Sequence, residues 1–180
     1  MQYFVDQNSV VRKIWGKSDT VLFIFAGAAA EFALNKAVDW LYYTGKLPSD
    51  PLGRLFSTVR YAHKIVFSPT DEAHKALEGL RHIHGALEQS RGYAIPDWAY
   101  RDVLFMLIHY SIASYELLEN KLSDAEKEEV YNVFFRLGTG MGLKSLPATY
   151  TEWLPVRKAH LMEDLEKSKY TDDLFLQYKK

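Results

Sequence analysis

Apolar residues along most of this chain recur every three or four positions, which is the spacing of amphipathic α-helices. No alternating run bounded by hairpin turns indicates a β-strand. The pattern predicts six helices, at about residues 20–43, 51–67, 70–90, 98–120, 123–138 and 150–167. We therefore expect an all-α single domain over residues 1–180. It should be a bundle of about six to seven helices around an apolar central pocket, with residues 1–18 and 168–180 peripheral.

Local signals set several of these boundaries. Pro51 follows Asp50 and suits the first position of a helix, where the missing N–H costs nothing. Ser123 and Glu126 form a capping-box pattern at the start of another helix. The Thr-Gly-Lys-Leu-Pro segment at residues 44–48 reads as a helix stop and a loop.

The most apolar run, residues 20–30, is shorter than the roughly 20 residues that a membrane span needs, and Glu31 ends it. A buried helix is the better interpretation, so we expect a cytoplasmic protein without stable membrane insertion. The formal net charge of −1 argues against nucleic acid as the main partner. The absence of cysteine excludes disulfides, thiol nucleophiles and iron–sulfur clusters. The 12 Tyr, 10 Phe and 4 Trp can fill a core or line an apolar cavity.

Helical phasing sorts the histidines by face. His84 lies on an apolar stripe that runs from Leu77 to Leu87, whereas His82 points to nearly the opposite side. His109 shares a face with apolar neighbours and is also expected to point inward. An inward imidazole is either a core side chain with a hydrogen-bond partner or a metal ligand. The two histidines that sit among charged residues are expected to be exposed: His74 and His160.

Arg54 and Thr58 lie four residues apart, so a helix places them on one face. There the arginine could hold a carboxylate of a charged prosthetic group. Both can equally be ordinary structure, with Arg54 paired to Asp50 and Thr58 bonded to a helix carbonyl. The sequence has no paired Glu-x-x-His motif, zinc-protease signature, P-loop, nucleophile elbow or dinucleotide fingerprint.

Four short segments follow one another along the chain in a characteristic order: FAGAAAEFAL at residues 25–34, DPLGRLFST at 50–58, RHIHG at 81–85 and LPATY at 146–150. In order and spacing they resemble the oxygenase family that contains the fungal MpaB proteins and bacterial latex-clearing protein, a rubber oxygenase. The resemblance covers about residues 21–165.

The resemblance implies a helical fold that binds one haem b without covalent attachment. It matches His84 to the proximal iron ligand, and Arg54 and Thr58 to the haem-pocket and propionate pair. It implies His109 as a further cofactor-binding residue. An acidic residue that acts as a base in rubber cleavage falls near Asp39. The expected catalytic set is Arg54, Thr58 and Asp39, the cofactor-binding set Arg54, Thr58, His84 and His109, and the metal ligand His84.

The family's activity is dioxygen-dependent cleavage of carbon–carbon double bonds in isoprenoid chains, so the resemblance implies an apolar substrate and dioxygen as partners. The chain departs from the rubber oxygenases at Ser57, where they have a lysine, and at Asn35-Lys36, where His-Pro is frequent. The alternative is a non-catalytic helical module that binds a lipid or a partner helix in an apolar cavity. An exposed apolar helix face could also make a homodimer.

Overall fold

The computed structural model of the chain describes residues 2–43 and 50–179, apart from the side chains of residues 51–57. The described part is all-α, as the sequence predicts. Its elements are α1 (Val10–Trp15), α2 (Ser18–Phe32), the 3₁₀ helix η1 (Lys36–Val38), α3 (Asp39–Tyr43), α4 (Pro51–Phe67), α5 (Thr70–Arg91), α6 (Asp97–Leu118), α7 (Asp124–Gly140), α8 (Tyr150–Glu163) and α9 (Lys169–Tyr178). The loop predicted at residues 44–48 and the side chains of Arg54 and Ser57 lie outside the described residues.

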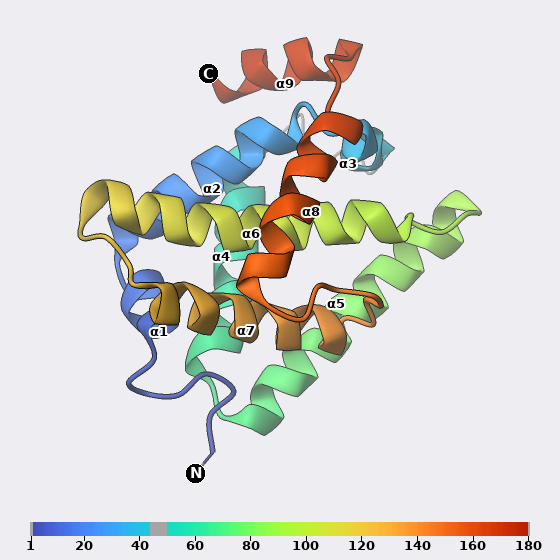
Figure 1. The fold of residues 1–180 in the computed structure, drawn as a ribbon. Coiled ribbons are helices and arrows are strands. Elements are labelled where there is room, and N and C mark those ends of the chain that lie inside the picture. The colour runs from blue at the N-terminus through green and yellow to red at the C-terminus, as the bar shows by residue number, and fades with distance from the viewer. Residues whose placement is uncertain (1, 44–49, 180) are drawn as a thin grey trace.

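Helix α6 runs through the middle of the fold (Figure 1). Its most extensive contact is with α2, and it also packs on α7 and α1. Helix α8 crosses in front of α6 in this view and packs on α7. Helices α4 and α5 pack against each other and reach the rest of the fold through α1 and α7.

The centre of the fold is filled by aromatic rings. Five large rings are buried almost completely: Trp15, Phe105, Tyr115, Tyr131 and Trp153. Phe105 and Trp153 meet edge to face at 5.9 Å between ring centroids, and the Trp15 indole donates a 3.1 Å hydrogen bond to Ser111. Rings of this size bury much apolar area. Unlike that of Trp15, the buried indole nitrogen of Trp153 has no hydrogen-bond partner among the described residues. The five rings occupy the space between α1, α6, α7 and α8, where the sequence led us to expect an apolar pocket.

Local capping confirms several predicted boundaries. Helix α4 begins at Pro51. The Ser123 hydroxyl accepts a hydrogen bond from the Glu126 N–H, and the Glu126 carboxylate accepts one from the Ser123 N–H, so the predicted capping box is confirmed. Helix α5 ends at Arg91 and is capped by Gly92, whose left-handed φ of 84° glycine adopts without strain.

Two expectations about the N-terminal third are wrong. The single helix predicted at residues 20–43 is three elements, because Asn35 takes an extended backbone (φ −75°, ψ 139°) and its side chain caps η1 through Ala37. Residues 1–18 are not peripheral, since Val5, Ile14 and Trp15 are buried in the main core. Helix α1, which the polar character of this segment concealed, carries two of these three side chains.

The C-terminal residues, which the sequence predicted to be peripheral, form helix α9. Ser168 and Thr171 make a capping box at its start. Leu174 then packs with Ala33 and Val38 in a small second cluster, separate from the main core. The helix is therefore anchored at one side of the fold by a few contacts.

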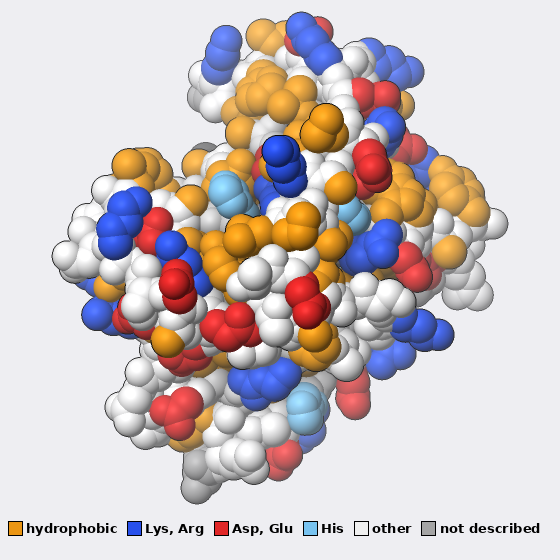
Figure 2. All heavy atoms as spheres, viewed as in Figure 1, with side chains coloured by type: hydrophobic (Ala, Val, Ile, Leu, Met, Phe, Trp, Pro, Cys, Tyr) orange, Lys and Arg blue, Asp and Glu red, His pale blue; other side chains and the backbone are white. Residues whose placement is uncertain are grey.

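Helices α8 and α9 also carry exposed apolar side chains among charged ones (Figure 2). They include Leu154, Leu161, Met162, Phe175, Leu176 and Tyr178. The predicted homodimer stays a prediction, and so does the cytoplasmic location. None of the helices formed by the described residues has the length and apolar character to cross a membrane.

Candidate functional site

The structure brings together the two helices that carry the predicted cofactor residues. Arg54 and Thr58 belong to α4, His84 belongs to α5, and the two helices pack against each other. Thr58 is exposed. Arg54 lies one turn before it on the same helix, but its side chain is outside the described residues. The pairing of these helices agrees with a shared site, while the roles of the three residues stay predictions.

His84 is half-buried and faces α6, whereas His82 is exposed, so the predicted phasing of α5 is confirmed. The His84 ring meets the Tyr100 ring at 5.2 Å between centroids, inclined by 61°. The Tyr100 hydroxyl donates to Glu88 at 3.2 Å, and the same carboxylate oxygen accepts a 2.9 Å bond from the Ile95 N–H. Burial raises the pKa of Tyr100, and the Glu88 charge raises it further, so the phenol remains a donor. These contacts fix the surface against which the imidazole rests.

The expectation that His109 points inward is wrong. Its side chain is exposed, because Ile108 and Ile112 occupy the buried side of α6 at this level. The His109 ring rests against the Tyr110 ring, with 4.9 Å between centroids. Desolvation by neighbouring protein atoms lowers the pKa of His109, and the Arg157 cation lowers it further against the opposing effect of Glu31, which favours the neutral imidazole. Its predicted cofactor role stays a prediction.

Asp39 lies at the start of α3, where its carboxylate pairs with Arg91 at the end of α5. The N–O distance is 2.5 Å, and the Arg91 side chain is 12% exposed. The guanidinium carbon lies 4.0 Å from the Trp40 ring centroid and 4.6 Å from that of Tyr93. Arg91 thus combines an ion pair with cation–π contacts. The arrangement ties α3 to α5, and the predicted role of Asp39 as a base stays a prediction.

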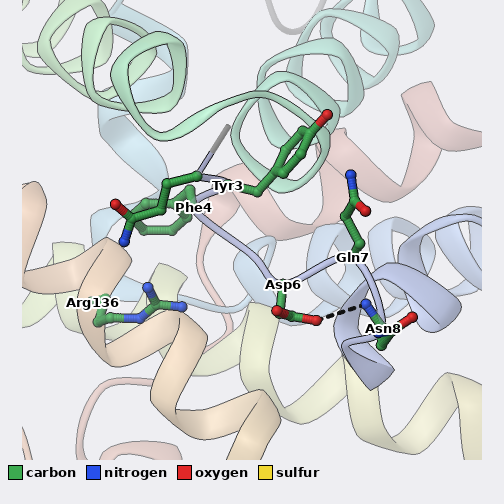
Figure 3. A pocket seen from close by; sticks show the side chains of 7 residues that line it. Tyr3, Phe4, Asp6, Gln7, Asn8 and Arg136 are labelled. Atoms are coloured by element: carbon green, nitrogen blue, oxygen red, sulfur yellow. Dashed lines mark hydrogen bonds between the residues drawn. The ribbon is translucent and has the colours of Figure 1, made fainter.

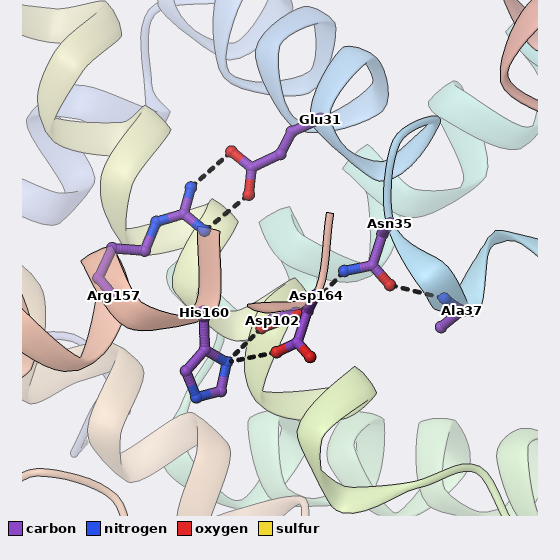
Figure 4. Close-up of polar contacts among 7 residues, drawn as sticks. All are labelled: Glu31, Asn35, Ala37, Asp102, Arg157, His160 and Asp164. Atoms are coloured by element: carbon purple, nitrogen blue, oxygen red, sulfur yellow. Dashed lines mark hydrogen bonds and ion pairs between the residues drawn. The ribbon is translucent and has the colours of Figure 1, made fainter. Parts of the chain in front are cut away.

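A buried ion pair that sequence reasoning missed joins α2 to α8 (Figure 4). The Glu31 carboxylate accepts two hydrogen bonds from the Arg157 guanidinium, at 2.6 and 2.5 Å. The two side chains are 7% and 6% exposed. Tyr110 of α6 donates a third bond to Glu31 at 3.1 Å, and burial together with this carboxylate raises the pKa of Tyr110 to about 12. The negative charge on α2 and the positive charge on α8 therefore neutralise each other in the protein interior.

A second buried polar group lies between α6, α8 and the turn before η1 (Figure 4). His160 Nδ1 lies 2.5 Å from Asp102 Oδ1 and 3.3 Å from Asp164 Oδ2. Asn35 donates to the other oxygen of Asp102 at 2.6 Å. Burial raises the pKa of Asp102, and the hydrogen bonds from His160 and Asn35 offset only part of that rise. We expected His160 to be exposed; that was wrong, because Asp102 lies on another helix and recruits it inward.

A cavity of about 670 Å³ lies between the N-terminal segment and α7 (Figure 3). It is lined by Gln2, Tyr3, Phe4, Asp6, Gln7, Asn8 and Arg136. The Arg136 guanidinium carbon lies 4.8 Å from the Phe4 ring centroid, and an adjoining cavity of about 370 Å³ shares this wall. The described lining of both cavities includes none of the predicted site residues. The second cavity does reach the first turns of α5 through Thr70 and His74, which precede His84 by ten residues or more.

Comparison with known proteins gives one finding of similarity. Residues 13–175 match the model of a protein family described as "ER-bound oxygenase mpaB/B'/Rubber oxygenase, catalytic domain". The matched range contains α2 to α8 and most of α9. No curated protein and no solved structure shows detectable similarity to the chain.

Proposed function

The chain belongs to the family of the mpaB and rubber oxygenases, and from this premise we propose that it is a haem b-dependent oxygenase. The proposed reaction uses dioxygen to cleave a carbon–carbon double bond in an apolar substrate of the isoprenoid class. The observation that carries the proposal is the family match, which spans both α4 and α5.

The donor chemistry of α5 suits an iron ligand. His84 offers a half-buried imidazole, which is a ligand that haem iron accepts. The adjacent Gly85 is exposed, and a Cβ added there would meet no other atom within 4 Å. Tyr100 supports the ring from the side of α6, and Glu88 in turn holds the Tyr100 hydroxyl. The residues present therefore fit the cofactor that the family implies.

Each residue has a distinct part in this proposal. His84 would hold the iron, and Arg54 on α4 would pair with a propionate carboxylate. Thr58, exposed one turn later, would offer a hydroxyl to the same pocket. When bound, haem supplies the iron that activates dioxygen. The exposed apolar side chains of Ile83 and Tyr61 would be covered by the cofactor or substrate, which would exclude water from the reacting double bond.

The test is an absorption titration of the purified protein with haemin. We expect stoichiometric uptake with a Soret band that differs from that of free haemin. His84→Ala should lose or shift this band. His82→Ala is the matched control, since His82 is exposed two residues away on the other side of α5, and it should leave the band unchanged. Protein that takes up no haemin would contradict the proposal.

A second measurement separates the oxygenase from a non-catalytic lipid-binding module. The haem-loaded protein should consume dioxygen in the presence of an isoprenoid oligomer and yield shorter products that end in carbonyl groups, seen by mass spectrometry. A lipid-binding module would instead bind an apolar fluorescent probe equally well in the wild type and in His84→Ala, with no oxygen uptake.

A further inference from the structure

The Asp102–His160–Asp164 cluster combines three metal-type ligands in a buried position, and the proposed haem function makes no use of it. One carboxylate and one imidazole come from different helices, α6 and α8, and Asp164 directly follows α8. The three ligand atoms all lie within 4.8 Å of one another. The side chains of Asp102, His160 and Asp164 are only 2%, 10% and 17% exposed.

The charges in this cluster do not balance by themselves. Asp102 and Asp164 contribute two negative charges when both are ionised. Within the described part of the chain, no lysine or arginine nitrogen lies within 4.0 Å of either carboxylate. Two carboxylates this close together and largely shielded from water are costly unless a cation offsets their charge. A divalent cation bound to a neutral imidazole would bring the sum to zero.

We propose that Asp102, His160 and Asp164 bind a divalent ion of the first transition series, with Zn²⁺ as the reference case. Such an ion takes nitrogen and carboxylate oxygen ligands at about 2.0–2.2 Å. In a tetrahedral site this places donor atoms roughly 3.3–3.6 Å apart. The 3.3 Å separation of His160 Nδ1 from Asp164 Oδ2 already has this value. The 2.5 Å contact with Asp102 Oδ1 would open by about 1 Å to admit the ion.

The surroundings of the cluster supply the outer support that metal ligands need. Asn35 donates to Asp102 Oδ2 at 2.6 Å, which leaves Oδ1 directed at the shared centre. The Asn35 oxygen is itself fixed by the Ala37 N–H at 2.8 Å. Outer hydrogen bonds of this kind orient a ligating carboxylate. Three protein ligands also leave a fourth position for water or another small ligand, as in open zinc sites.

The ligand set also selects among ions. Imidazole suits Zn²⁺, Co²⁺ and similar ions, whereas Mg²⁺ and Ca²⁺ prefer more ligands and only oxygen. We therefore expect the cluster to bind Zn²⁺ and Co²⁺ and to discriminate against Mg²⁺. Metal binding here does not depend on haem binding, because the cluster includes none of the residues assigned to the haem.

The experiment titrates chelator-treated full-length protein with Zn²⁺ by calorimetry and with Co²⁺ by visible absorption. We expect one equivalent to bind, and Zn²⁺ to raise the melting temperature as its concentration rises. Asp164→Asn should weaken binding at least tenfold, because it removes a ligand charge at the most accessible of the three positions. Glu163→Gln is the matched control: it makes the same charge change at an exposed neighbour and should bind like the wild type.

His84→Ala should bind Zn²⁺ as the wild type does, so failure of the haem proposal and failure of the metal proposal give different results. Wild-type protein that takes up no Zn²⁺ or Co²⁺ would overturn the metal proposal, whatever the variants do. Equal affinity of Asp164→Asn and Glu163→Gln would overturn it as well, because bound metal would then lie elsewhere. Circular dichroism confirms that each variant is folded before its affinity is compared.

Discussion

Replacing Glu31 by glutamine leaves Arg157 without its counter-charge in the protein interior. In the native structure the guanidinium makes two hydrogen bonds to Glu31, at 2.6 and 2.5 Å, and both side chains are less than a tenth exposed. Arginine cannot lose its proton to relieve the charge. Breaking such a pair by removing one partner costs about 3–5 kcal/mol. That is a large part of the roughly 5–15 kcal/mol by which a typical domain is stable.

The assay is urea unfolding followed by far-UV circular dichroism, with thermal melts in parallel. Each kcal/mol shifts the melting temperature of a chain of this size by about 2–4 °C, so Glu31→Gln should melt about 6–20 °C lower. The exposed Glu163→Gln serves as the control for charge removal and should change stability by less than about 0.5 kcal/mol. A double variant, Glu31→Leu with Arg157→Met, should recover much of the loss, since it removes both charges together.

Two results would refute this reasoning. If Glu31→Gln is as stable as Glu163→Gln, the ion pair carries no weight in holding α8 to α2. If the double variant is as unstable as the single one, the loss comes from disturbed packing around α8 and not from an unpaired buried charge.

Two further predictions concern packing and pH. A Cβ added at Gly27 would lie 2.3 Å from ring atoms of Tyr110, so Gly27→Ala should destabilise the protein by about 1–3 kcal/mol. Gly79 has open space around it, so Gly79→Ala should stabilise the protein by about 0.4–1 kcal/mol. Thermal melts in which both variants shift equally would contradict this. Burial would raise the pKa of Glu116, but the Leu122 N–H and two lysines outweigh it and lower the pKa. The stabilisation that ionised Glu116 gives the folded state is therefore present at pH values above the pKa of Glu116 in the unfolded chain. It is lost as the pH falls through the pKa of Glu116 in the folded protein. In urea titrations, the decrease in the free energy of unfolding caused by Glu116→Gln should therefore become smaller below about pH 4. A decrease that does not depend on pH would contradict a lowered pKa for Glu116.

The sequence predicted best where structure is decided locally. The start of α7 follows from Ser123 and Glu126, which lie three residues apart and satisfy each other's backbone groups. The orientation of His84 against His82 follows from the helical period alone. Neither inference needs to know which helices pack together.

The prediction failed where the partner is distant in the chain. His160 sits among charged residues, and only the fold brings Asp102, 58 residues away, to its ring. Glu31 and Arg157 are 126 residues apart. One local signal was available: Trp153, Arg157 and His160 recur at i, i+4 and i+7, which marks one face of a helix. Because two of the three are polar, a search for apolar periodicity overlooks that face.

The same polarity explains how α8 can have one defined orientation. Leu154, Leu161 and Met162 are exposed on this helix, whereas Trp153 is buried in the main core, so rotating α8 to cover the exposed side chains would withdraw the indole from that core. A rotated helix would leave Arg157 and His160 away from Glu31 and Asp102, with buried charges on α2 and α6 unpaired. The two polar contacts and the buried Trp153 therefore favour the same orientation of α8, which leaves Leu154, Leu161 and Met162 outside. The leucines of α8 are therefore exposed in part because Glu31 on α2 and Asp102 on α6 need Arg157 and His160 on the buried side of the helix.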